Sequence, residues 1–300
     1  MKRCRDMNTL LKLSALAGAL ALAAGPAAAV DHYLVAKPSL GGVDLPVSGG
    51  TTENVPMWGY VLDADLTDPA GTGGPDGIGD CYQAADATAR ITCIDGLPEP
   101  TLPGPHLVQD PTENIFRIYL TNGLPQPTSV VIPGQALPWS PGTATGPTWD
   151  DNSTGGRGGN LTKKVRSYGL EAAANGGTQL YVWASQRNSA LQRSGTFMYH
   201  SGTLPQLQVY MGLYGAMTKD AAPGVAYDGA PAVTYDNEVV LFYSDVDPVH
   251  NAAVAAGDAA YTPIHYQAQW FLVNGEPYEA GVTGDIPAGS AVSDDTDDRP

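Results

Sequence analysis

The chain has 300 residues, 43% of them hydrophobic, which is enough for one large domain or two ordinary domains with a buried core. Its 36 glycines and 25 prolines exclude a mainly helical protein and favour many short strands joined by turns. The formal net charge of −16 argues against nucleic-acid binding, because so acidic a protein repels phosphate backbones. The same charge favours cations as partners, although solubility alone also explains it.

The N-terminal residues 1–29 have the pattern of a signal peptide. A positively charged start is followed by an apolar run at residues 13–24 and by small residues suited to cleavage. The run is too short to span a bilayer, and no later segment is long and apolar enough to do so. We therefore expect a mature chain that begins near Val30 and is periplasmic or extracellular. The alternative is an N-terminal membrane anchor.

An acidic, glycine-rich stretch follows the first predicted core strand, which covers residues 57–62. Residues 63–80 carry five aspartates among five glycines: Asp63, Asp65, Asp68, Asp76 and Asp80. Carboxylates on a flexible loop are ligands that calcium prefers. The spacing of an EF-hand is absent, because no glutamate closes the loop. The stretch thus predicts either a calcium site or an ordinary acidic surface insertion.

Two cysteines, Cys81 and Cys93, remain once Cys4 is removed with the signal peptide. An even number in an exported protein favours a disulfide that closes a short loop. The chain-entropy model gives such a bond about 3 kcal/mol of stabilisation. As metal thiolates the pair would need further ligands nearby, and the sequence shows none. A sulfur-ligated blue-copper centre therefore has no support here.

Further strands follow in the middle of the chain. Residues 114–122 predict a strand, since Phe116, Ile118 and Leu120 alternate with polar positions. Residues 130–132 predict a buried strand, and residues 165–168 and 179–183 predict two more. The segment 136–166 is typical of a loop-like insertion.

The stretch at residues 195–215 reads GTFMYHSGTLPQLQVYMGLYG and contains one histidine, His200. Aromatic and β-branched residues on both sides of a Gly-Thr-Leu-Pro break predict two extended segments with a tight connection. Helix is disfavoured here because Pro205 and several glycines interrupt the stretch.

This stretch resembles the end of a cupredoxin domain in a multicopper oxidase. That family has a Gly-Thr-aromatic-x-Tyr-His-Ser-His run, followed by a Gln-x-x-x-Gly-Leu-x-Gly segment. Residues 195–202 match the run as far as His200, and residues 208–215 match the second segment. The second histidine of the family pattern is replaced by Gly202.

An earlier strand in the family usually carries His-x-His-Gly, which places two imidazoles on one face because side chains alternate along a strand. Aligned on Gly134, the two histidine positions of this chain hold Val131 and Pro133. Neither side chain can bind copper. We therefore interpret this segment as a buried strand and nothing more.

The resemblance covers roughly residues 102–278 and implies an all-β, cupredoxin-like Greek-key β-sandwich. It implies one complete domain with insertions at residues 30–220. A partial second domain at residues 221–300, with strands at 237–245 and 266–278, ends in an acidic tail expected to be disordered. We predict that this second unit docks against the first domain or stays partly disordered.

The family activity is the oxidation of a substrate by one-electron steps, with reduction of dioxygen at a copper cluster. Copper needs several imidazole or thiolate ligands at one point. The five histidines of this chain include no His-x-His pair, so His200 is the one candidate copper ligand. The others, His32, His106, His250 and His265, are predicted to be surface or turn residues.

Two arrangements could complete a copper site at His200. A partner subunit could supply the other ligands, or missing C-terminal domains of a longer enzyme could do so. The leading hypothesis is an exported multicopper-oxidase-like protein in which copper binding is weak or lost. The alternatives are a catalytically silent cupredoxin sandwich used for binding or assembly, and a surface protein stabilised by calcium.

Overall fold

The computed structural model describes residues 31–47, 51–63, 80–113, 115–139, 148–150, 164–184, 193–229, 231–258 and 261–277. The predicted signal peptide, three of the loop aspartates (Asp65, Asp68 and Asp76) and the acidic tail lie outside these residues.

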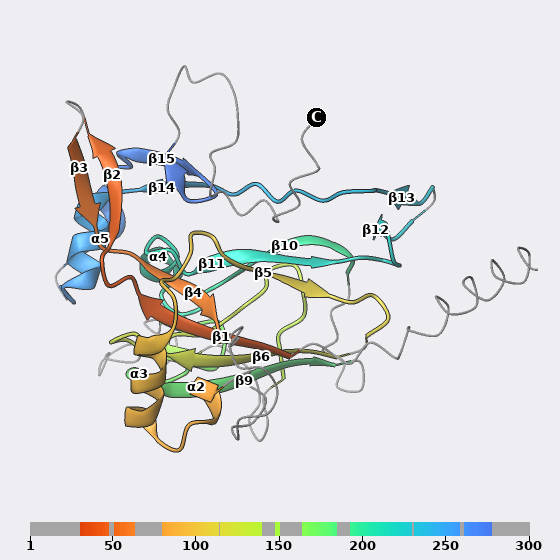
Figure 1. Cartoon of the computed structure of the whole chain (residues 1–300), viewed down its shortest axis with the longest axis horizontal. Coiled ribbons are helices and arrows are strands. Elements are labelled where there is room, and N and C mark those ends of the chain that lie inside the picture. The colour runs from red at the N-terminus through yellow and green to blue at the C-terminus, as the bar shows by residue number, and fades with distance from the viewer. Residues whose placement is uncertain are drawn as a thin grey trace, which may run out of the picture.

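Two facing sheets form the body of the molecule (Figure 1). The first contains, in spatial order, β4 (Trp58–Leu62), β1 (Asp31–Pro38), β6 (Ile115–Asn122) and β9 (Gly177–Ala184). The second contains β10 (Gly195–His200), β11 (Tyr214–Lys219) and β5 (Gly104–Gln109). The β1–β6 and β11–β5 pairs are parallel, and the other pairs in these sheets are antiparallel. Parallel neighbours cannot be joined by a hairpin, so the chain crosses between the sheets.

The core lies between these two sheets. Phe116, Ile118 and Leu120 of β6 are buried as the alternation predicted, and Trp183 of β9 and Tyr199 of β10 pack in the same cluster. Burial of each such side chain contributes roughly 1.5–3 kcal/mol. The predicted all-β class is therefore confirmed, and the predicted strands at 57–62, 114–122, 165–168 and 179–183 are present with small changes of boundary.

Two helices cover the outer face of the first sheet, where the sequence had predicted only a loop. They are α2 (Asp80–Gln83) and α3 (Ala87–Gly96). Asp86 caps α3, because its side chain accepts a hydrogen bond from the backbone N–H of Ala89. Val35 of β1 packs beneath the helices with Cys81 and Ile94, so β1 is buried on both faces.

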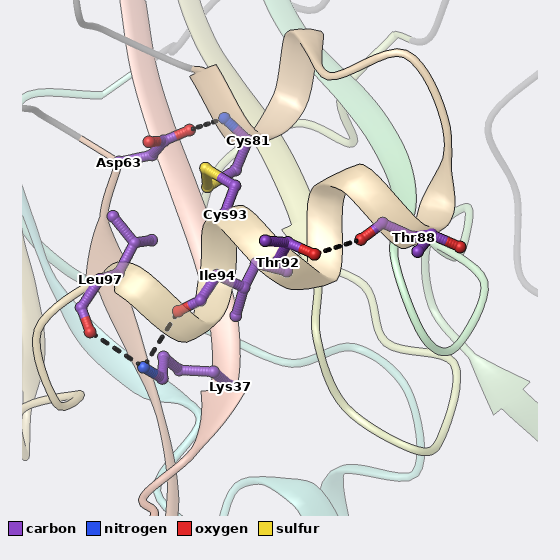
Figure 2. The surroundings of a disulfide bond; sticks show 8 residues. All are labelled: Lys37, Asp63, Cys81, Thr88, Thr92, Cys93, Ile94 and Leu97. Carbon is purple, nitrogen blue, oxygen red and sulfur yellow. Dashed lines mark hydrogen bonds between the residues drawn. A yellow bond between two sulfur atoms is a disulfide. The ribbon is translucent and has the colours of Figure 1, made fainter.

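The predicted disulfide joins Cys81 of α2 to Cys93 of α3 (Figure 2). The Cα atoms are 5.3 Å apart, within the ordinary range for the bond. Lys37 of β1 is almost completely buried nearby, and its Nζ donates to the carbonyl oxygens of Ile94, Leu97 and Pro98. The ammonium group thus caps the C-terminal end of α3, where carbonyls lack partners within the helix.

The stretch at residues 195–215, which contains His200, differs from the prediction in its second half. Residues 195–200 form β10 as expected, but α4 (Pro205–Gln208) follows, and the next strand begins only at Tyr214. Pro205 does not prevent this helix, because the first helical turn has no use for the N–H that proline lacks.

The C-terminal part of the described chain forms a third layer beside the second sheet (Figure 1). It contains β14 (Tyr243–Val246), α5 (Pro248–Ala255), the 3₁₀ helix η3 (Pro263–His265), β15 (Trp270–Val273) and β16 (Glu276–Pro277). The strands are shorter than predicted, because residues 237–242 precede β14 without strand pairing and Gly275 lies in the turn that separates β15 from β16.

This part packs against a hairpin formed by β2 (Val43–Val47) and β3 (Thr51–Val55). Leu45, Val55, Val246, Trp270 and Leu272 belong to one buried cluster, and Trp270 Nε1 donates to the Pro46 carbonyl at 2.6 Å. The prediction that the second unit docks against the first domain is confirmed for these residues. The division of the chain at residue 220 stays a prediction.

Two short antiparallel pairs complete the described strands. They are β7 (Thr148–Asp150) with β8 (Lys164–Ser167), and β12 (Val225–Tyr227) with β13 (Val233–Thr234). Among the described residues there is no helix whose length and apolar character would allow it to cross a membrane.

Candidate functional site around His200

His200 is the last residue of β10, where the two segments singled out by the sequence meet. Its backbone N–H donates to the carbonyl of Val131 at 3.0 Å, and Val131 N–H donates back to the His200 carbonyl at 2.9 Å. Val130, Val131 and Ile132 are all buried, although their pairing with β10 is confined to this single bridge. The position that aligns with a family histidine, Val131, therefore lies directly beside His200.

The imidazole of His200 is half-buried and has a defined tautomer. Its Nδ1 lies 2.8 Å from the carbonyl oxygen of Ser201. Because a carbonyl only accepts hydrogen bonds, Nδ1 carries the proton and Nε2 keeps its lone pair. Burial lowers the pKa of His200, and the contact with Ser201 opposes this only in part. The side chain is therefore neutral at pH 7, the form in which histidine binds metals.

The position of the second family histidine, Gly202, has no space for a side chain. A Cβ atom placed on Gly202 would lie 2.8 Å from Cγ1 of Val131 and 2.9 Å from Oγ of Ser129. Real Cβ contacts are longer than this, so even a methyl group would require its neighbours to move. An imidazole at this position would need a larger rearrangement.

A network of buried hydroxyl and amide groups lies beside Gly202. Its side chains are at most 1% exposed and come from Thr128, Ser129, Ser167, Ser201, Thr203 and Gln208. Gln208 Oε1 accepts hydrogen bonds from Thr128 Oγ1 at 2.9 Å and from Ser201 Oγ at 2.6 Å. Its Nε2 donates to the Pro127 carbonyl at 2.9 Å. One end of the network is thus organised by a single amide.

The other end of the network consists of three hydroxyls. Thr203 Oγ1 lies 3.0 Å from both Ser129 Oγ and Ser167 Oγ, and the two serine oxygens are 2.8 Å apart. Ser167 also donates to the Gly169 carbonyl at 2.8 Å. Every side chain in the network therefore has a partner, as buried polar groups require.

Sequence reasoning missed this network. The signal available was the group of small hydroxyl residues around Gly202 and on the segment before Val131. Gln208 was assigned to a strand, although it lies in α4 and points into the core.

Among the described residues, His200 belongs to no group of three or more His, Cys, Asp or Glu ligand atoms. The one group of three His, Cys, Asp or Glu ligand atoms close together in those residues is Asp63, Cys81 and Cys93. The cysteine sulfurs are joined to each other, so neither is a thiolate. The residues present at His200 thus do not fit a copper cluster, which needs several converging imidazole or thiolate ligands.

The aspartates predicted to bind calcium receive no support from the described chain. Asp63 is 3% exposed, and its Oδ2 accepts the backbone N–H of Cys81 at 2.9 Å, so it anchors α2 (Figure 2). Burial raises its pKa. Asp80 is exposed at the start of α2.

Two histidines were wrongly predicted to be surface residues. His32 on β1 is 8% exposed and packs against the ring of Phe116. His250 on α5 is completely buried. The sequence signal for α5 was Asp247-Pro248, since Asp247 caps the helix and Pro248 occupies its first turn. His106 and His265 are exposed, as predicted.

His250 links α5 to α4. Its Nε2 donates to the Leu207 carbonyl at 3.2 Å, which leaves Nδ1 to accept from the Tyr261 hydroxyl at 3.0 Å. Burial lowers the pKa of His250. Both nitrogens of the neutral ring are therefore satisfied, which indicates a structural histidine.

No protein-family model matches the sequence, and no curated protein matches it. Solved structures similar to the chain are multicopper oxidases. One is a multi-copper oxidase from Pseudomonas Thermotolerans, with 20% identity, a TM-score of 0.34, and 66% of this chain and 31% of that chain covered. A laccase from Botrytis aclada has 18% identity, a TM-score of 0.40, and 85% and 33% covered.

A third is Fet3p, described as a multicopper oxidase that functions in iron import. It has 18% identity, a TM-score of 0.43, and 82% of this chain and 33% of that chain covered. The chain spans about a third of the length of these three structures. At such identities the likeness concerns the fold alone.

Proposed function

We propose that the chain is an exported, multicopper-oxidase-like cupredoxin sandwich that forms no copper cluster from its own residues and serves as a binding or assembly module. Export is supported by the charge and apolar pattern of residues 1–29. The polar network described above occupies the region where the family resemblance implies metal ligands. The sandwich therefore keeps its core closed without a metal ion.

The observation that carries this proposal is the lack of space at Gly202. His200 survives at one family position, while Val131 and Ser129 fill the space that a side chain at the other would need. Restoring a ligand there would also disturb the network, because Ser129 is bonded to Thr203 and Ser167. A buried polar group that loses its partner costs about 1–3 kcal/mol. The packing around Gly202 therefore leaves no room for the second histidine of the family pattern.

A second candidate function is copper-dependent oxidation completed by other chains or domains. The tautomer of His200 favours it, because Nδ1 is held by the Ser201 carbonyl and Nε2 is left unprotonated. Further ligands would come from a partner subunit or from C-terminal domains beyond this sequence. His200 would then contribute one ligand to a shared site.

Metal analysis separates the two candidates. The purified chain and a His200→Ala variant are incubated with a copper salt, passed through a desalting column and analysed for bound copper and for oxygen uptake with a phenolic substrate. We expect little copper in either protein and no oxygen uptake. Several copper ions per chain with oxidase activity, both lost in the variant, would overturn the proposal. A single copper ion lost in the variant, without activity, would favour a shared site.

A further inference from the structure

A large apolar pocket lies between the second sheet and the antiparallel pair of strands β14 and β15. Its volume is about 700 Å³, within the range of sites for small organic ligands. The wall is shared by both layers and includes Met57, Tyr214, Tyr243, Asp245, Phe271 and Leu272. None of these residues belongs to the hydroxyl network beside Gly202.

The pocket has a buried floor and an exposed aromatic rim. Met57, Tyr214 and Leu272 are at most 7% exposed, whereas Tyr243 is 76% exposed and Phe271 is 62% exposed. Apolar residues that are exposed singly are common on protein surfaces and need no explanation. Exposed aromatic side chains that gather around a cavity are instead typical of a binding site. The rim therefore offers several π faces to a ligand.

Of the described residues that line the pocket, one has a charged side chain, Asp245. This group is fixed in place, since its Oδ1 accepts a hydrogen bond from the Tyr266 hydroxyl at 2.8 Å. Among the described residues that line the pocket there is no lysine, arginine or histidine to neutralise the carboxylate. The formal charge of −16 on the whole chain adds a long-range attraction for positive ligands.

We propose that this pocket binds a hydrophobic organic cation, such as an aryl-substituted or quaternary ammonium compound. The aromatic faces attract the cation through their quadrupoles, and Asp245 supplies the opposite charge. The apolar floor accommodates the uncharged body of the ligand. This inference goes beyond the proposed function and does not depend on whether His200 binds copper.

Two ions of the same shape and opposite charge test the proposal. The full chain, kept in a chelator so that metal binding plays no part, is titrated by calorimetry with tetraphenylphosphonium and with tetraphenylborate. We expect the cation to bind at least about tenfold more tightly than the anion. Equal affinity for the two ions, or no binding of either, would overturn the proposal.

Two variants locate the site. Asp245→Asn should weaken phosphonium binding roughly threefold to tenfold, because it removes the charge and keeps an oxygen for Tyr266. Phe271→Ala should weaken binding of the phosphonium ion through lost aromatic contact, and its exposure predicts little effect on folding. Matched controls are Asp95→Asn on α3 and Tyr168→Ala, both at exposed positions outside the pocket. If the control variants weaken binding as much as the pocket variants, the site is elsewhere.

Discussion

The close packing around Gly202 can be tested through stability alone. A methyl group on Gly202 would lie 2.8 Å from Val131 Cγ1 and 2.9 Å from Ser129 Oγ. Both neighbours are buried, and Ser129 is held by two hydrogen bonds, so neither can move freely. Overpacking of this kind costs about 1–3 kcal/mol. We expect Gly202→Ala to lower the free energy of unfolding by that amount.

A double-mutant cycle identifies the neighbour responsible. Val131→Ala removes the methyl group that Gly202→Ala would meet first, but leaves the contact with Ser129 Oγ. The double variant should therefore be more stable than the sum of the two single variants predicts, by about 1 kcal/mol. The rescue is expected to be partial.

Urea unfolding at constant pH measures each stability, with equal m-values required before midpoints are compared. Gly41→Ala is the control, because a Cβ atom on Gly41 has nothing within 4 Å. It should change the stability by less than about 0.5 kcal/mol. If Gly202→Ala is as neutral as the control, or if the cycle is additive, Gly202 has room for a side chain. The packing argument would then be wrong.

Three further predictions concern the disulfide, the buried lysine and the buried histidine. Replacing both Cys81 and Cys93 by alanine should lower the free energy of unfolding by about 3 kcal/mol, since the cysteines are 12 residues apart in sequence; urea unfolding measures it. Lys37→Met should lower the free energy of unfolding by at least about 1–3 kcal/mol, because it leaves carbonyl groups at the end of α3 without their donor. Thermal unfolding measures this loss. Burial lowers the pKa of His250 below its ordinary 6.5, so the unfolded chain binds the proton more readily. Stability should therefore fall as the pH drops below about 6.5, and less steeply in His250→Gln.

Each of these predictions has a control or an outcome that would contradict it. Reduction of the native disulfide should reproduce the loss seen in the alanine variant, and no effect of either change would contradict the entropic estimate. Lys219→Met, at a partly exposed position, should be nearly neutral. An equal loss there would mean that the capping role of Lys37 is wrong. An unchanged pH profile in His250→Gln would show that other histidines with lowered pKa values, such as His32, dominate.

The strands of the sandwich were predictable where side chains alternate strictly. Phe116, Ile118 and Leu120 give that pattern, and β6 follows it. The alternation pattern does not predict α4 correctly. The order of apolar and polar residues at 205–208 fits either a strand or one helical turn. Leu204, with a φ of 39°, turns the chain into that helix. Such local geometry depends on the surrounding core rather than on propensity.

The candidate site was predictable only in part. Two short motifs singled out Val131 and His200 separately, and the structure joins these two residues by a backbone bridge. What the motifs could not give was the identity of the atoms that fill the space beside Gly202. Those atoms belong to Val131 and Ser129, and Ser129 is held by Thr203, which lies 74 residues away in sequence. Only the tertiary structure brings them together.

The hydroxyl network joins the segments around Thr128, Ser167, Ser201 and Gln208, which lie in different parts of the sandwich. A metal ion could hold such segments together with a few strong bonds, whereas each hydrogen bond contributes only about 1 kcal/mol net. A substitution within the network is nonetheless destabilising, because any member that loses its partner becomes a buried unsatisfied group. A copper site at this position would therefore require several substitutions at once, and the intermediate variants would be less stable. The described residues around His200 are thus held together by hydrogen bonds and close packing.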